Sequence, residues 1–297
     1  MIVEARAKIN WTLEILGQRP DGYHLLDMLM QPITLADRIL LTPADSLSLE
    51  TEGPIPQPAG EDNLALRAAL RLKEATSYAG GAAIRLEKHI PTQAGLGGGS
   101  ADAAGVLAGL NRLWQTGLSG EQLEEIGLGL GADVPFCIRG GLCRVRGIGE
   151  SLTAMPSAPA WPLIVLQPCG GLSTGEVFRA WHARGREQPV HTEETLKALL
   201  SGSPAALPAH PGNDLETVSF ALEPILAEAC RALRETGAIC AQMSGSGSAV
   251  FGVYPDPSAR DRACPVIQAA WPGAVCCDTC AESLVLDSNP CAFSHEL

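Results

Sequence analysis

A run of glycines followed by a serine and an alanine-rich stretch is the part of this chain best suited to chemistry. Glycine allows positive φ and close approach of a ligand to the backbone, and serine is a preferred helix N-cap. Free N–H groups and the dipole at the start of a following helix favour a phosphate. We therefore predict a phosphate-binding loop in which Ser100 caps the helix and Gly98 needs positive φ; the alternative is a flexible surface turn. The glycines are Gly95, Gly97, Gly98 and Gly99.

This loop differs from two familiar phosphate-binding motifs. It is not a Walker loop, because no Gly-Lys-Ser/Thr closes it. The dinucleotide fingerprint needs Gly or Ala where Ser100 stands. A formal match to that fingerprint within residues 127–132 follows a helical pattern rather than a strand, so we discard it.

The composition indicates a globular chain with an acidic excess. The 297 residues carry a formal net charge of −12, and aromatic residues make up 4%. A nucleic-acid surface would need a basic stripe, and a membrane span would need about 20 consecutive apolar residues. Neither partner is therefore expected. The N-terminal residues lack the apolar core of a signal peptide, which predicts a cytoplasmic protein. Nothing in the sequence specifies an oligomeric state.

The chain contains ten cysteines. In a cytoplasmic protein we expect them to be reduced and mostly buried. Cys277 and Cys280 form a C-x-x-C motif, but no second pair follows at zinc spacing. We interpret both as ordinary core or surface thiols.

Local patterns in the first half predict strands and helices in mixed order. Residues 9–15 alternate strictly between apolar and polar side chains, as in a strand, and residues 20–22 form a turn signal. We expect strands over 38–42 and 47–51 that pair with each other, a loop over 53–61, a helix over 63–76, a strand over 83–90, helices over 100–113 and 120–130, and a strand over 136–145.

A proline cluster over residues 156–162 marks the expected domain boundary, which divides 1–158 from 159–297. Beyond it, strands over 237–242 and 249–254 flank a second glycine-rich segment, Ser244–Ser248. Because strands and helices do not alternate regularly, we predict an α+β fold. The other expected elements are a strand over 163–166 and helices over 174–183, 193–200, 213–221 and 223–236.

Three stretches agree in order and spacing with one enzyme family. They are Ala7–Asn10, Pro91–Ala104 and Met243–Ser248, and they resemble the GHMP kinases, which include galactokinase, homoserine kinase and mevalonate kinase. Gln93 stands where the most similar members usually have glycine. This departure affects only the expected local shape of the loop. Further segments resemble the members that act on a cytidyl substrate: Arg19–His24, Gly95–Ser100, Gly131–Phe136 and Gly212–Leu215.

The resemblance implies an α+β, two-domain GHMP kinase fold with the active site in the interdomain cleft. It implies ATP-dependent phosphorylation of a hydroxyl on a small-molecule cytidyl diphosphate substrate, with Mg²⁺ bridging the ATP phosphates. Two alternatives are another small-molecule kinase of the family, of the homoserine or mevalonate type, and a non-catalytic ligand sensor. The ATP-binding residues implied are Pro91, Ala94, Gly95, Leu96, Gly97, Gly98, Gly99 and Ser100.

The resemblance also implies that Asp133 and Lys8 are catalytic. Asp133 would accept the alcohol's proton late, in the transition state; alternatively, it only terminates a helix. Lys8 and Asn10 lie two apart on the predicted strand and share a face. Lys8 would then pair with Asp133 and stabilise developing charge, and Asn10 would donate a hydrogen bond to the substrate. The alternative is a solvated strand face.

The same resemblance implies a binding site for the cytosine base. Tyr23 suits stacking on a pyrimidine, His24 would hydrogen-bond its polar edge, and Phe178 would supply the opposite stacking face. Ser100 is a candidate magnesium ligand, with no acidic partner assigned. Ser244–Ser248 is a second backbone nest that braces the phosphate loop or the substrate's diphosphate, a hairpin turn between two strands, or both.

Overall fold

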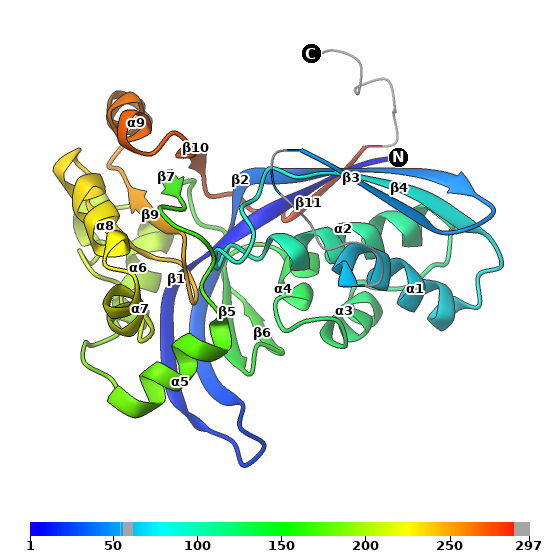
Figure 1. Ribbon diagram of the computed structural model, residues 1–297, viewed down its shortest axis with the longest axis horizontal. Helices are drawn as coiled ribbons and strands as arrows, with labels where there is room; N and C mark the ends of the chain where they lie inside the picture. The colour runs from blue at the N-terminus through cyan, green and yellow to red at the C-terminus, as the bar shows by residue number, and fades with distance from the viewer. Residues whose placement is uncertain (54, 56–61, 288–297) are drawn as a thin grey trace.

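Two long N-terminal strands form the centre of the larger of two sheets (Figure 1). The computed structural model describes residues 1–53, 55 and 62–287. Strands β1 (Ile2–Gln18) and β2 (His24–Ala44) pair antiparallel on either side of the turn at residues 20–22. The other strands of this sheet are β3 (Ser48–Glu52), β4 (Gly81–Glu87), β5 (Cys143–Gly147), β6 (Ser151–Ala154) and β11 (Leu284–Asp287). Their order is β11-β1-β2-β4-β3, with β5 between β2 and β6.

The smaller sheet is antiparallel, in the order β10-β7-β9-β8. Its strands are β7 (Pro162–Leu166), β8 (Cys240–Met243), β9 (Val250–Val253) and β10 (Val275–Asp278). Trp11 of β1 packs edge-on against Trp161 and Phe251, with ring centroids 6.1 and 5.9 Å away. These contacts join the larger sheet to the smaller one.

Helices cover both sheets. They are α1 (Leu64–Thr76), α2 (Gly98–Leu113), α3 (Gly120–Leu128), α4 (Val134–Arg139), α5 (Thr174–Arg184), α6 (Thr192–Ser201), α7 (Glu216–Leu222), α8 (Ile225–Glu235) and α9 (Pro257–Ala270). Helices α1 to α4 lie along the larger sheet in Figure 1, and α2 packs on β1 and β2. A Cβ at Gly109 of α2 would lie 2.4 Å from Leu41 Cδ1, so glycine permits this close packing. None of the described helices is long and apolar enough to cross a bilayer.

Several predicted elements are confirmed. The first half contains the helix after Asn63, which caps it by accepting from Ala65 N, and the helix after Ser119, which forms a capping box with Gln122. In the second half, β7, helices α5 to α8, and the antiparallel pair β8 and β9 lie where they were expected, with shorter or shifted ends. Most of the predicted loop over 53–61 lies outside the described residues.

Three structural predictions are wrong. The strand over 47–51 pairs parallel with β4 and not with 38–42, because β4 lies between them. Residues 136–139 are helical and not a strand, since Pro135 lies in the first turn of α4 and the apolar side chains of that helix pack inward. The cysteines are not all reduced: a disulfide joins Cys264 and Cys276, which the packing of α9 on β10 brings together. The division into 1–158 and 159–297 stays a prediction, and β11 returns to the larger sheet.

Candidate active site

The glycine-rich loop leads from β4 into α2, as predicted, but its glycines act at different positions. Gly95 and Gly97 have φ of +73° and +71°, whereas Gly98 is not among the residues with positive φ. A Cβ at Gly95 would lie 2.0 Å from Ser244 O, and a Cβ at Gly97 would lie 3.0 Å from Lys8 Cγ. These two positions therefore require glycine both for backbone conformation and for close packing.

Ser100 is not the N-cap of the helix. The helix begins at Gly98, and Gly97 occupies the cap position in the left-handed conformation without a side-chain cap. The helix therefore starts two residues before the predicted start at residue 100, because Gly98 and Gly99 are helical despite the low helix propensity of glycine. The N–H groups of this first turn therefore belong to Gly98, Gly99 and Ser100, and they stay available to an anion.

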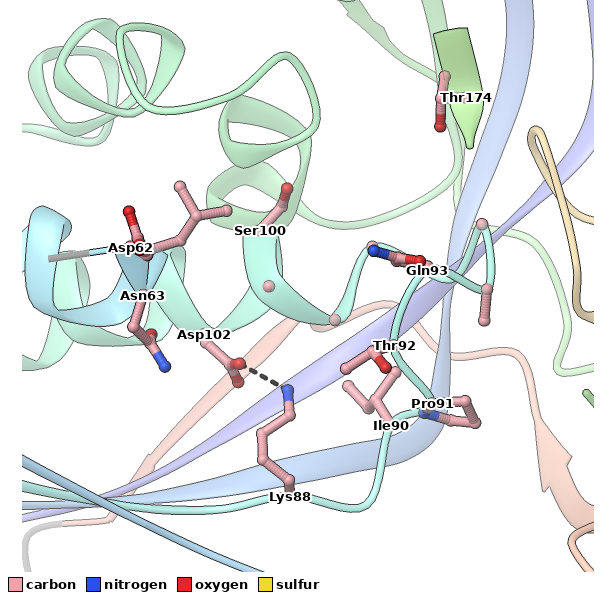
Figure 2. Close-up of a pocket in the computed structure, with 16 residues that line it drawn as sticks. Asp62, Asn63, Lys88, Ile90, Pro91, Thr92, Gln93, Ser100, Asp102 and Thr174 are labelled. Atoms are coloured by element: carbon pink, nitrogen blue, oxygen red, sulfur yellow. Dashed lines mark hydrogen bonds and ion pairs between the residues drawn. The ribbon is translucent and has the colours of Figure 1, made fainter. Parts of the chain in front are cut away.

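A cavity of about 570 Å³ opens beside this loop (Figure 2). We call it the loop cavity. Its walls are the loop residues 90–95 and 97–100, together with Asp62, Asn63 and Leu64 at the start of α1. Lys88 and Asp102 form its base, and Figure 2 shows their side chains meeting beneath the loop. Sequence reasoning missed Asn63, Lys88 and Asp102. Asn63 and Lys88 lie outside the glycine motif, and Asp102, although it lies within Pro91–Ala104, meets Lys88 only in the fold.

Lys88 lies in a buried ionic cluster with Asp37 and Asp102. Its Nζ donates to Asp102 Oδ2 at 2.6 Å and to Asp37 Oδ2, and all three side chains are at most 2% exposed. Asp37 Oδ1 also accepts from the backbone N of His89 and Ile90, at 2.6 and 2.8 Å. The cluster thus ties β2 and the loop's entrance to α2.

Charge is unbalanced in this cluster, since two carboxylates share one ammonium group. Burial raises the pKa of Asp102 to about 8, although Lys88 pulls it the other way. Burial alone would lower the pKa of Lys88, but the two aspartates outweigh it and raise that pKa. A proton on Asp102 neutralises the cluster, which lowers the cost of burying it.

A second hollow, the central cavity, holds the predicted catalytic residues. It has a volume of about 450 Å³ and is lined by Lys8, Asn10 and Asp133 together with Gly245–Gly247. Lys8 Nζ lies 3.3 Å from Asp133 Oδ2 and donates to Asn10 Oδ1 at 2.7 Å. Lys8 and Asn10 are buried, so the solvated strand face is wrong. The pairing of Lys8 with Asp133 is confirmed, and the catalytic roles stay predictions.

The second glycine-rich segment fits both of its interpretations. It connects the antiparallel strands β8 and β9, and it packs on the phosphate loop. Ser244 Oγ donates to Gly95 O at 3.0 Å, and Ala249 N donates to Ala94 O at 2.9 Å. Asn213 Nδ2 also donates to Gly245 O at 2.8 Å. The segment is therefore a hairpin turn that braces the loop.

The third hollow, the hairpin cavity, has a volume of about 580 Å³ and an apolar character. Tyr23 and His24 of the β1–β2 hairpin line one side, and Phe178 of α5 lines the other. Tyr23 is 59% exposed, and the His24 ring stacks on Phe178 with centroids 4.6 Å apart. Phe178 thus faces His24. The proposed stacking of Tyr23 and Phe178 on a pyrimidine stays a prediction.

His24 carries a free polar atom. Its Nε2 is buried without a hydrogen-bond partner among the described residues. Burial, and secondly His182, lower the pKa of His24, so the ring is neutral at pH 7. A neutral imidazole can donate or accept a hydrogen bond, and a buried polar atom without a partner favours a bound polar group.

Family models match two regions of this chain, and a curated protein matches most of its length. The models for the GHMP kinases N terminal domain and the GHMP kinases C terminal region match residues 63–141 and 195–273. A 4-diphosphocytidyl-2-C-methyl-D-erythritol kinase from Pelotomaculum thermopropionicum is 45% identical over 262 residues, 87% of this chain and 91% of that protein.

Solved structures agree as well. A crystal structure of 4-(cytidine 5'-diphospho)-2C-methyl-D-erythritol kinase matches with a TM-score of 0.81 and 38% identity, over 94% of this chain and 99% of that chain. A homoserine kinase from Cytophaga hutchinsonii matches with a TM-score of 0.74 over 96% of each chain. At 17% identity, the homoserine kinase shows a shared fold alone.

Proposed function

This chain belongs to the GHMP kinase family, and we propose that it uses ATP to phosphorylate the 2-hydroxyl of 4-diphosphocytidyl-2-C-methyl-D-erythritol, a step in non-mevalonate isoprenoid precursor synthesis. The observation that carries the proposal is the order of the three cavities. Gln93, Gly95 and Thr174 line both the loop cavity and the central cavity. Leu26, Thr174 and Phe178 line both the central cavity and the hairpin cavity. The central cavity, which contains the Lys8–Asp133 pair, thus lies between the loop cavity and the hairpin cavity.

In this proposal the loop cavity holds ATP. Backbone N–H groups at the start of α2 bind its phosphates, and Lys88 and Asn63 lie beside the remainder of the nucleotide. Among the described residues, no three His, Cys, Asp or Glu side chains gather to hold a metal ion. Ser100, which lines the loop cavity, is the candidate protein ligand for Mg²⁺, and the ion would supply positive charge that neutralises the ATP phosphates.

The central cavity would carry out the transfer. Asp133 takes the proton of the attacking hydroxyl as the bond to phosphorus forms, and Lys8 stabilises the charge on the attacking oxygen or the phosphate. Asn10 accepts a hydrogen bond from Lys8 through Oδ1, which leaves its amide NH₂ to face Met28 Sδ or a substrate oxygen. The buried position of Lys8 strengthens its interaction with charge, because water screens it little.

The hairpin cavity would take the cytidine. Its apolar walls suit a pyrimidine ring, Tyr23 offers an exposed ring for stacking, and His24 Nε2 offers a hydrogen bond to the polar edge of the base. The diphosphate would then lie near Gly245–Gly247 and Thr174, which line the central cavity. A cytoplasmic location stays a prediction from the sequence.

A substrate panel tests this function. Purified protein is incubated with ATP and Mg²⁺ and either the cytidyl substrate, homoserine or mevalonate, and ADP release is measured. The proposal expects turnover of the cytidyl substrate alone. Turnover of homoserine or mevalonate instead would assign a different kinase of the family, and ATP binding without turnover of any substrate would indicate a ligand sensor.

A further inference from the structure

The two walls of the hairpin cavity come from segments far apart in sequence. One wall is the β1–β2 hairpin with Gln18, Tyr23 and His24, and the other is α5 with Phe178 and His182. Figure 1 shows α5 beside the two strands of this projecting hairpin. The width of the cavity therefore depends on what holds α5 at a fixed distance from the hairpin.

Helix α5 contacts the hairpin in its middle, where Phe178 stacks on His24 and Trp181 meets the same ring edge-on. Val177 is its buried residue, and most of its other side chains are exposed or half-buried. Its N-terminal end is held by Thr174, whose Oγ1 lies 2.9 Å from Ser246 Oγ. Its aromatic residues thus hold α5 against His24, and polar contacts at its two ends add to this hold.

At the other end, Arg186 lies two residues past the helix and binds β1 through an ion pair and a hydrogen bond. Its Nε donates to Asp214 Oδ1 at 2.9 Å, and its Nη2 donates to Asp214 Oδ2 and to Ile15 O, both at 2.9 Å. Its Nη1 lies 2.9 Å from Glu14 Oε1. We call this set of contacts the Arg186 clamp. Bidentate pairing of a guanidinium with a carboxylate fixes distance and angle together.

Asp214 itself is firmly attached to β1. Its side chain is 0% exposed, its Oδ2 accepts from Ile15 N at 2.7 Å, and its backbone N donates to Leu13 O at 2.9 Å. The Gly212–Leu215 motif thus has a physical role: it supplies a rigid anchor beside β1. Because β1 continues from Ile15 to Gln18 in the hairpin, the clamp connects the end of α5 to the base of the opposite wall.

We propose that Arg186 is a positioning residue for the cytidyl site, a proposal that rests on the proposed function. Arg186 lines none of the three cavities, yet its clamp fixes the C-terminal end of α5 relative to β1 and thereby supports the stack of Phe178 on His24. Releasing the clamp lets α5 swing about its N-terminal end, which moves Phe178 and His182 away from Tyr23. Thr174 stays tied to Ser246, so the Lys8–Asp133 pair and the loop cavity keep their geometry, although Phe178 also lines the central cavity.

The test compares Arg186→Ala and Arg186→Lys with the wild type. Arg186→Ala is expected to raise KM for the cytidyl substrate and the dissociation constant for CMP by roughly three- to thirtyfold. The lysine variant keeps the charge but loses bidentate geometry, so its effect is intermediate. For both variants kcat and KM for ATP stay within about twofold of the wild type, an effect below 0.5 kcal/mol.

Arg260→Ala is the matched control. Arg260 also donates to a carboxylate, Asp278, and to a backbone carbonyl, that of Cys277, but it lies on α9 against the smaller sheet. It should leave CMP binding unchanged. Unchanged CMP affinity in Arg186→Ala, an equal rise in KM for ATP, or an equal effect of Arg260→Ala would each overturn the proposal. Wild-type turnover tests the proposed function separately, because CMP binding is measured without any reaction.

Discussion

The loop cavity and the hairpin cavity are built in opposite ways. The loop cavity rests on backbone groups of a helix packed on the larger sheet and on three charged side chains that are at most 2% exposed. The hairpin cavity rests on an exposed tyrosine, a histidine stacked on a phenylalanine, and a helix with little buried surface. The loop cavity, the proposed ATP site, is thus fixed by the core, whereas the hairpin cavity, the proposed cytidyl site, depends on surface side chains.

Because of this difference, substitutions in the two regions should affect different properties of the protein. Altering the ATP side means altering buried charges and close-packed glycines, which costs stability. Altering the cytidyl side means altering surface side chains, which costs mainly affinity. Variants at the loop cavity should therefore lower the free energy of unfolding, whereas variants at the hairpin cavity should lower the affinity for the cytidyl substrate.

The largest effect is expected between the two regions, at Asp133. Asp133→Asn should lower kcat by about 10²- to 10⁴-fold, because the general base is lost, while nucleotide affinity and stability are kept. Steady-state kinetics and calorimetry with an ATP analogue measure this. Asp256→Asn is the control, since Asp256 is also an N-cap aspartate, on α9, and asparagine caps equally well. Unchanged kcat in folded Asp133→Asn would refute the base assignment.

Lys88→Met tests the buried side of the comparison. It leaves Asp37 and Asp102 buried without their cation, and it should lower the free energy of unfolding by about 3–5 kcal/mol. Urea unfolding gives this value. Lys197→Met, at an exposed position on α6, should change it by less than about 0.5 kcal/mol. A loss below about 1 kcal/mol at Lys88 would mean that the cluster does not hold the loop in place.

Tyr23→Ala tests the exposed side. Loss of one stacking face should cost roughly 1–3 kcal/mol of binding, or about five- to a hundredfold in KM for the cytidyl substrate. KM for ATP and the free energy of unfolding should change little, because Tyr23 is largely exposed. If KM rises equally for both substrates, the tyrosine is structural and the two regions are not independent.

The smallest effect is expected at Gln93, where φ is +52°. Left-handed backbone strains a residue with a side chain, so Gln93→Gly should raise stability by roughly 0.5–1 kcal/mol after the greater freedom of glycine in the unfolded chain is counted. Gln115→Gly is the matched control, because Gln115 has φ of +55° beyond the end of α2. Thermal unfolding of both variants measures the gain, and a loss at Gln93 alone would show that its side chain supports the loop.

Sequence patterns were sufficient where a local signal decides the structure. The helix after Ser119, the strand around Ile9 and the glycine loop could be predicted because propensity and periodicity act within a few residues. Helix α9 and strand β11 were missed, because Pro265 interrupts the helical pattern and β11 depends on pairing with β1. Tertiary packing overrides local propensity at such places.

The site shows the same limit. Lys8 and Asp133 could be named because each lies in a recognisable motif, and the structure brings them within 3.3 Å. Asp37, Lys88 and Asp102 could not, because their roles come from three elements that meet only in the fold. Helix capping by Gly97 rather than Ser100 was equally unpredictable, since close packing against Lys8 outweighs the better capping side chain.

The central claim is that the two nucleotides bind in separate cavities that meet at the Lys8–Asp133 pair. Calorimetric titration of CMP, without and then with a saturating non-hydrolysable ATP analogue, tests it most directly. We expect one CMP bound per chain in both titrations, with affinities that agree within about threefold, or less than 0.7 kcal/mol. Loss of CMP binding when the analogue is present would contradict it, because the two nucleotides would then compete for one site.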